Sequence, residues 1–423
     1  MPSRLLRWNP WRGLGGLPRE IWVLSLTTLV NRMGTMVLPF FVLYLTRAAG
    51  FTTGQAGFFV LLYGAGALVA APLAGRLSDL LGPIRVMRVS LLVSGAVLLA
   101  FPLARSAAAV GGMTVLLAMT AESYRPANLT IFGDLVRPEL RKAAFAVNRL
   151  AINLGMSVGP ALGGFLATVS FRWLFLVDGA TSLAAGAILV LSRFPPRPHV
   201  ASSNPAVEAL ADRTRPPGGH RDRRLLLFLA AMFPVNVVFF QHISSMPLFL
   251  VQDLRLSPAT YGLLFTVNTL MIVFLEVPVN LRTAHWPHRA TLSAGALLCG
   301  LGFGALAVAW DVWSVAATVA IWTFGEMLLF PGMADYLTAI APPRRRGEYM
   351  GLSQMTIGLA FLVGPWAGLQ LLARFGGRVL WGTMLACGIA AAGMLAVVVR
   401  PGGSPARKPE GGKEVRGDPW RIG

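Results

Sequence analysis

Four charged side chains lie near the middle of long apolar stretches of the chain: Arg32, Glu122, Arg125 and Glu326. A charge at the middle of a bilayer costs about 2.5–3.5 kcal/mol on insertion scales, so a charge retained in such a stretch indicates function. Burial favours the neutral form of a carboxyl, and Glu326 has no basic residue within one helical turn. A carboxyl in that setting can take up and release a proton, which is the chemistry we expect of Glu326.

Other polar side chains lie in the same kind of stretch. Glu122 and Arg125 are three residues apart on one predicted helix, so they can form an ion pair that is either structural or functional. The polar positions predicted to line a cavity are Asn31, Arg32, Arg125, Asn128, Asn236, Gln241, His242 and Asn268. Hydrogen bonding between helices explains the uncharged ones equally well.

The chain lacks the signatures of several other chemistries. Cys299 and Cys387 lie within apolar runs, so we expect no disulfide framework and no metal site. No phosphate-cradling glycine loop or nucleophile elbow is present. We therefore expect no enzyme and no cofactor, and a membrane-embedded enzyme remains only a remote alternative.

The elements that position the polar side chains are predicted to be membrane-spanning helices. Of 423 residues, 55% are hydrophobic and 13% are charged, which is about half the charge of an ordinary soluble chain. A bilayer crossing needs about 20 mostly apolar residues. Twelve stretches are predicted to cross: 20–46, 54–75, 84–104, 109–135, 142–169, 171–193, 224–251, 257–281, 289–310, 312–340, 347–373 and 378–400. The composition thus excludes a soluble globular enzyme and predicts an all-α integral membrane protein.

The basic residues predict the orientation of these spans. Of the 37 Lys and Arg residues, 28 lie in the two tails and every second loop, six lie in the other loops, and three lie within spans. Because basic residues collect on the cytoplasmic side, both termini are predicted to be cytoplasmic, in a plasma or inner membrane. The net charge of +19 then reflects topology and contact with anionic lipid headgroups, and we expect no nucleic-acid partner.

The chain contains an internal repeat. A shift of 205 residues, without gaps, aligns Asn31 with Asn236, Gly57 with Gly262, Pro126 with Pro331, Gly159-Pro160 with Gly364-Pro365, and Gly163 with Gly368. The predicted organisation is an N-terminal tail (1–19), a six-helix half (20–193), a cytoplasmic linker (194–223), a second half (224–400) and a disordered tail (401–423). A single offset across so many identities predicts two six-helix halves in the same orientation.

A motif follows the second span. Gly75, Asp79 and Gly82, followed by Arg85, resemble the loop signature G-x-L-x-D-R-x-G-R-(R/K) of the major facilitator superfamily. The resemblance implies two parallel six-helix halves. We expect the two glycines to permit a tight turn, and Asp79 to accept a hydrogen bond from Arg85 as a conformational latch. Leu80 stands where the family has a basic residue.

The fifth span contains small residues at intervals of four, at which a neighbouring helix can pack closely. Gly155, Gly159, Pro160, Gly163 and Gly164 resemble the G-x-x-x-G-P-x-x-G-G pattern of the superfamily's drug/proton antiporters. Generic helix packing explains the spacing as well, but the resemblance favours antiport.

The tenth span supplies the last motif. Its G-E-x-x-x-x-P opening, with Glu326, resembles a proton-coupled multidrug branch of the superfamily, and Asp134 matches a second acid of that branch. The resemblance implies proton coupling through Glu326 and Asp134, with Glu122 as a further embedded acid. The function that we expect is proton-coupled efflux of small amphipathic molecules by a monomer, with the proton as coupling ion. A proton-driven importer of peptides or other nutrients is the alternative.

Overall fold

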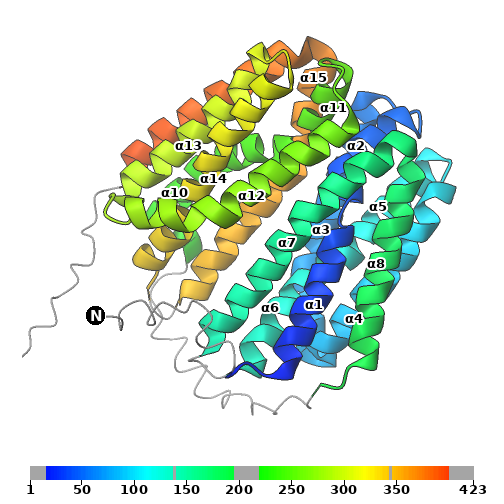
Figure 1. The fold of residues 1–423 in the computed structure, drawn as a ribbon. Helices are drawn as coiled ribbons and strands as arrows, with labels where there is room; N and C mark the ends of the chain where they lie inside the picture. Colours follow the sequence, from blue (N-terminus) through cyan, green and yellow to red (C-terminus); the bar gives the residue numbers. More distant parts are fainter. Residues whose placement is uncertain (1–15, 137–139, 195–218, 343–344, 400–423) are drawn as a thin grey trace, which may run out of the picture.

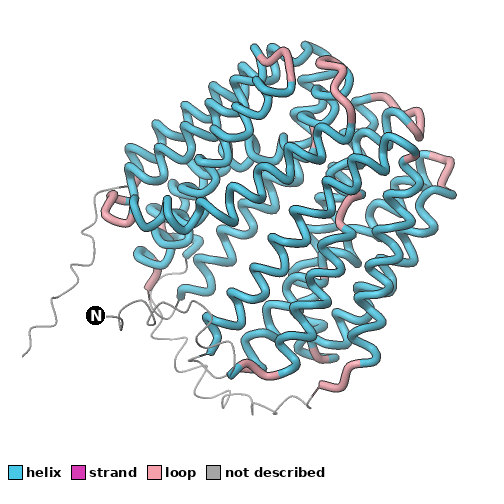
Figure 2. Tube along the Cα trace, viewed as in Figure 1, coloured by secondary structure: helices cyan, strands magenta, loops and turns pink. Residues whose placement is uncertain are grey.

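The computed structural model describes residues 16–136, 140–194, 219–342 and 345–399, and within these ranges the chain is helical without a strand (Figure 2). The side chains at 133, 134, 141 and 142 are not among those described. The first helices are α1 (Arg19–Gly34), α2 (Val37–Arg47), α3 (Thr53–Leu81), α4 (Pro83–Ala100), α5 (Ala107–Glu122), α6 (Tyr124–Leu135), α7 (Arg141–Val169) and α8 (Phe171–Leu191). The later ones are α10 (Arg223–Phe239), α11 (Ser245–Gln252), α12 (Pro258–Thr283), α13 (His288–Ala305), α14 (Val312–Ile340) and α15 (Arg346–Val398).

The described helices account for the predicted spans, although not one for one. Ten stretches among them are long and apolar enough to cross a membrane. The last, α15, has 53 residues, or about 80 Å at 1.5 Å a residue, and Gly376 with a positive φ of 79° divides it into two spans. The span predicted at 109–135 is split, because α5 ends at Glu122 and α6 begins at Tyr124. Pro126 in the first turn of α6 accounts for this break, because proline has no backbone N–H to donate to the Glu122 carbonyl four residues earlier.

The helices form two bundles that lie side by side (Figure 1). Helices α1 to α8 pack among themselves, and so do α10 to α15, while α7 packs against α12 and α3 against α15 to join the two. We refer to these bundles as the first and second halves. Most of the predicted linker 194–223 and of the two predicted tails lies outside the described residues, so those limits stay predictions.

Both halves interrupt their first span at equivalent positions. In the first half, α1 ends at Gly34 and α2 begins at Val37. In the second half, a 3₁₀ turn at Phe240–Ile243 separates α10 from α11. The two breaks coincide under the shift of 205 residues, so the repeat extends to an irregularity that hydrophobic patterning does not predict.

The buried apolar residues show where the halves meet. One cluster contains residues of both halves, such as Phe40 and Phe41 with Leu250 and Trp381. Two further clusters, around Phe132 and around Phe228, each contain residues of one half alone. We call the end with the shared cluster, near loops 48–52 and 253–257, the closed end. At the opposite end, near Gly82, the described buried clusters of the two halves are separate.

Candidate functional site

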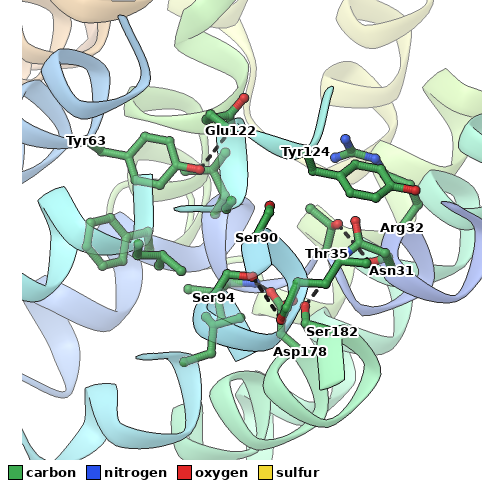
Figure 3. A pocket seen from close by; sticks show the side chains of 17 residues that line it. Asn31, Arg32, Thr35, Tyr63, Ser90, Ser94, Glu122, Tyr124, Asp178 and Ser182 are labelled. Carbon is green, nitrogen blue, oxygen red and sulfur yellow. Dashed lines mark hydrogen bonds between the residues drawn. The ribbon is translucent and has the colours of Figure 1, made fainter. Parts of the chain in front are cut away.

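A polar cavity lies inside the first half (Figure 3). It offers about 80 Å³ to water-sized molecules, which is room for several waters. Its ionisable lining residues come from five helices: Arg32 of α1, Tyr63 of α3, Glu122 of α5, Tyr124 of α6 and Asp178 of α8. The predicted cavity residues Asn31 and Arg32 belong to this lining.

The side chain of Asp178, on α8, forms hydrogen bonds to the backbone at the break between α1 and α2. Its Oδ2 accepts hydrogen bonds from the backbone N–H groups of Met36 (3.3 Å) and Val37 (3.1 Å). These N–H groups stand at the start of α2, where a helix has no internal acceptor and favours negative charge. Arg32, in the last turn of α1, places a positive charge at the opposite kind of helix end. The break is therefore stabilised by one charge of each sign.

Two further groups of hydrogen bonds hold polar side chains of this half. The Tyr63 hydroxyl donates to Glu122 Oε1 at 3.0 Å. Asn148 Oδ1 accepts hydrogen bonds from the Thr28 hydroxyl at 3.2 Å and from Asn128 Nδ2 at 3.4 Å. Asn128 therefore joins α6 to α7 and does not line the cavity. The buried Nε of Arg32 has no hydrogen-bond partner among the described residues.

Glu122 and Arg125 do not form the ion pair that their spacing in the sequence allows. Glu122 is the last residue of α5, whereas Arg125 lies beyond the break in α6 and is exposed. The two residues thus do not share one continuous helix, which was the basis of the expectation. Among the described residues, Glu122 is instead held by Tyr63.

A second polar cluster surrounds Glu326 in the other half. Asn268 Nδ2 of α12 donates to Glu326 Oε2 at 3.0 Å and to the Thr323 hydroxyl at 3.0 Å. Trp322 and Phe330 lie four residues before and after Glu326, so the three share one face of α14. Phe239 of α10 contacts both aromatic rings, with centroid distances of 6.1 Å to Trp322 and 5.0 Å to Phe330. The rings of Trp322, Phe330 and Phe239 form an aromatic wall, and Glu326 lies on the same face of α14 as the first two.

His242 belongs to the same wall. Its Nδ1 lies 2.6 Å from the Phe239 carbonyl oxygen, and its ring centroid lies 4.6 Å from that of Phe239.

Two other predicted cavity residues instead form hydrogen bonds to backbone oxygens of the second half. Asn236 donates to Met232 O at 2.8 Å, and Gln241 donates to Gly364 O at 2.9 Å across to α15.

The glycine motif of the fifth span has two packing faces. A Cβ at Gly159 would lie 2.9 Å from the Arg32 carbonyl oxygen, and Gly155 and Gly163 likewise pack against the segment around the α1–α2 break. A Cβ at Gly164 would lie 2.7 Å from the Pro258 carbonyl oxygen, so the other face packs on α12. Pro160 contacts α12 through Gly262. The motif therefore packs against both the break and the second half.

The loop motif differs from its expectation in two respects. Gly75 lies within α3, and the turn is made by Gly82, whose φ is +87°. Asp79 and Arg85 are both exposed, and no hydrogen bond or ion pair between them appears in the described part of the chain. The expected latch is therefore not formed in this conformation. Asp134 has its backbone in α6, but its side chain lies outside the described residues.

Asp178 is the functional candidate that sequence reasoning missed. It is a charged residue seven positions inside the predicted span at 171–193, so the cost of burying a charge could have identified it. Its partners could not have been found in this way, because they are backbone groups more than 140 residues away in the chain.

Comparisons with known proteins identify the family to which this architecture belongs. The family model described as Major Facilitator Superfamily matches residues 24–257 and 242–422. The MFS-type transporter YqjV of Bacillus subtilis (strain 168) is 25% identical over 381 residues, covering 88% of this chain and 91% of the relative. The multidrug resistance protein MdtH of Aeromonas salmonicida (strain A449) is 25% identical over 356 residues, covering 81% and 85%.

A solved structure of the peptide transporter POT in complex with sulfate superimposes with a TM-score of 0.75 at 17% identity, covering 90% of this chain and 94% of that one. At this identity the likeness concerns the fold. Two joined helical bundles and the matching relatives define an integral membrane transporter of small molecules, not an enzyme. The chain belongs to the Major Facilitator Superfamily.

Proposed function

We propose that this protein exports small amphipathic molecules in exchange for protons, with Glu326 as the proton carrier. The observation that carries the proposal is the position of Glu326 on the face of α14 that presents the aromatic rings of Trp322 and Phe330, with its carboxyl hydrogen-bonded to the Asn268 amide. Aromatic faces bind apolar and cationic groups. A carboxylate beside them attracts a cationic substrate, and its protonation removes that attraction.

The immediate partners of Glu326 favour this role. Asn268 can donate to the ionised carboxylate, and its amide oxygen can accept a hydrogen bond from the protonated form after rotation. No basic side chain lies within ion-pair distance of Glu326 among the described residues. Without a fixed cation beside it, the carboxyl is not held in its ionised form, so it can gain and lose a proton during the transport cycle.

The arrangement of the buried clusters supports a mechanism of alternating access. The halves share a hydrophobic cluster at the closed end and have separate clusters at the other end. With both termini cytoplasmic, as the distribution of basic residues predicts, the separated end faces the cytoplasm. We assign Asp134 and Glu122 as further acids on the proton route, and Asp79 with Arg85 as a latch that forms when the halves close at that end.

The test uses purified protein in proteoliposomes with an imposed pH gradient and ethidium, an aromatic cation, as the probe. Glu326→Gln keeps the shape and hydrogen-bonding capacity of the side chain but cannot carry a proton. We expect it to bind ethidium more weakly, because Gln copies the uncharged, protonated carboxyl, and to lose gradient-driven transport. Asp335→Asn is the matched control, because Asp335 lies on the same helix, is exposed, and pairs with His288 at 2.9 Å. We expect this control to transport ethidium as the wild type does.

Undiminished gradient-driven transport by Glu326→Gln would remove Glu326 as the carrier. Equal losses in both variants would mean that removing an acid from α14 damages the helix in general, and would also contradict the assignment.

A further inference from the structure

We propose that Asp178 is a second proton-binding carboxyl, in the first half, which acts on the closed end of the molecule through the break in the first span. The proposal rests on the proposed function, since it takes proton binding to drive the exchange of conformations. It concerns a different half and a different helix from Glu326. Asp178 would act as a positioning residue for α2.

The first step is the effect of a proton on the break. Asp178 accepts its two hydrogen bonds from backbone N–H groups at the start of α2, those of Met36 and Val37. Hydrogen bonds to an ionised acceptor are roughly twice as strong as neutral ones, and a helix N-terminus favours negative charge. Protonation of Asp178 therefore weakens the attachment of α2 to α8.

The second step is the contact of α2 with the other half. Phe40 of α2 packs edge-on against Tyr261 of α12, with ring centroids 5.2 Å apart. Arg47, the last residue of α2, donates to the Val251 carbonyl oxygen of α11 at 3.0 Å. Because α2 is part of the seal at the closed end, a change in its attachment reaches the contact between the halves.

The third step is the balance of charge in the cavity. Its lining holds two carboxyls, Glu122 and Asp178, and one guanidinium, Arg32. No ion pair among these three groups appears in the described chain. An unpaired carboxylate is costly to bury, so one of the two carboxyls is expected to be protonated, and the cavity has room for water that could deliver the proton.

The other groups that face Asp178 do not supply the missing positive charge. The cavity lining contributes the hydroxyls of Tyr63 and Tyr124, and α4 contributes serines, Ser90 and Ser94. The side of α7 that packs on the break presents glycines. Arg125 is exposed and outside the lining. On α4, Arg88 is held by the Leu189 and Ser192 carbonyl oxygens at the far end of α8.

The second half shows that a carboxyl is not required to build such a break. The shift of 205 residues places Thr383 at the position of Asp178. The break before α11 is secured by a neutral amide, because Gln241 donates to Gly364 O at 2.9 Å and accepts from the Ser245 hydroxyl at 2.8 Å. The second-half break contains His242, but among the described residues only the first half uses a carboxyl to accept hydrogen bonds from the N–H groups after its break, and this calls for a role beyond packing.

The experiment measures the distance across the closed end as a function of pH. Spin labels are placed at Ala48 and Gln252, which are exposed at the ends of α2 and α11, after replacement of the two native cysteines. The full chain is studied in lipid nanodiscs. Each proton linked to the transition contributes about a tenfold change per pH unit in the ratio of separated to closed conformers.

We expect Asp178→Asn, which keeps an oxygen for the α2 N–H groups, to lose about one tenfold step per pH unit. Ser182→Ala is the matched control, since Ser182 lies one turn along α8 and lines the same cavity, and we expect its pH profile to be unchanged. If Asp178→Asn does not fold, Asp178→Thr copies the second half and should lose the same step. Replacing Na⁺ by choline at constant pH should leave the wild-type ratio unchanged.

The outcomes separate this proposal from the role of Glu326. An unchanged pH profile in the Asp178 variants, with proton-driven transport lost in Glu326→Gln, would overturn the proposal and leave the proposed function standing. A reduced pH profile in the Asp178 variants, with normal transport by Glu326→Gln, would support the proposal and overturn the carrier role of Glu326. A ratio that follows Na⁺ and depends on Asp178 would replace the proton by a metal cation, and would also overturn the proposal.

Discussion

Gly262 allows α7 and α12 to approach closely, and its replacement by alanine should open the closed end. A Cβ at this position would lie 3.1 Å from the Pro160 carbonyl carbon, 3.3 Å from Ala161 Cα, and closer still to the Pro160 oxygen. These are backbone atoms, so no flexible side chain can move aside. The two helices belong to different halves, and the halves must separate to make room.

The magnitude follows from the cost of overpacking. An added methyl in a well-packed contact costs about 1–3 kcal/mol, which corresponds to about a 5- to 150-fold change in a conformer ratio. This cost falls only on the conformer in which α7 and α12 touch. The helix-propensity advantage of alanine over glycine, about 1 kcal/mol, applies to both conformers and cancels. We therefore expect Gly262→Ala to favour separation of the closed end.

The assay is the distance between spin labels at Ala48 and Gln252 at constant pH. Gly112→Ala is the control, because Gly112 has no atom within 4 Å of a Cβ built on it. We expect a longer mean distance for Gly262→Ala and the wild-type distance for Gly112→Ala. Identical distance distributions for the two variants would show that the α7–α12 contact does not hold the closed end, and would refute the reasoning.

Two further predictions concern the stability of the helices. Trp381 is fully buried in the cluster shared by both halves, so its replacement by alanine should cost about 3–5 kcal/mol of stability. Trp310 is 76% exposed, so its replacement should cost little. Thermal unfolding in detergent compares the two variants, and equal losses would contradict the account of the core. At the start of α14, the hydroxyl of Ser314 and then its backbone N–H hold the pKa of the Asp311 carboxyl below its usual value. The stabilisation of this helix end is therefore present above the usual pKa and lost as the pH falls through the lowered one. Asp311→Asn should remove that pH dependence, as measured by hydrogen exchange over the first turn of α14 after correction for intrinsic rates.

The helical fold could be predicted from the sequence because a bilayer imposes its own length. Runs of about 20 apolar residues identify the spans, and the offset of 205 residues identifies the repeat. The breaks could not be predicted in the same way. The α1–α2 break depends on Asp178 of a distant helix, and the division of α15 depends on one glycine, Gly376, with a positive φ.

The candidate site could be predicted only in part. Glu326 stands out because a lone acid in an apolar span is costly, yet Phe239, which contacts the two aromatic rings on the Glu326 face of α14, comes from another helix and is visible only in the structure. Asn236 and Gln241 look like cavity residues in the sequence. In the structure they bond to backbone oxygens, because a polar side chain in an apolar bundle takes whichever acceptor the packing offers.

The direction of proton movement tests the central claim most directly. Wild-type protein is reconstituted into proteoliposomes that contain a pH-sensitive dye, with no imposed pH gradient and with the membrane potential clamped. Ethidium is then allowed to run down its own concentration gradient, and a dipeptide is tested in the same way.

Antiport through Glu326 predicts that ethidium entering the vesicles drives protons out, so the interior becomes more alkaline, and that Glu326→Gln abolishes this change. Acidification of the interior as a probe enters would mean that proton and substrate move together, as in an importer, and would contradict the account. Ethidium movement by the wild type without any change in internal pH would contradict it as well.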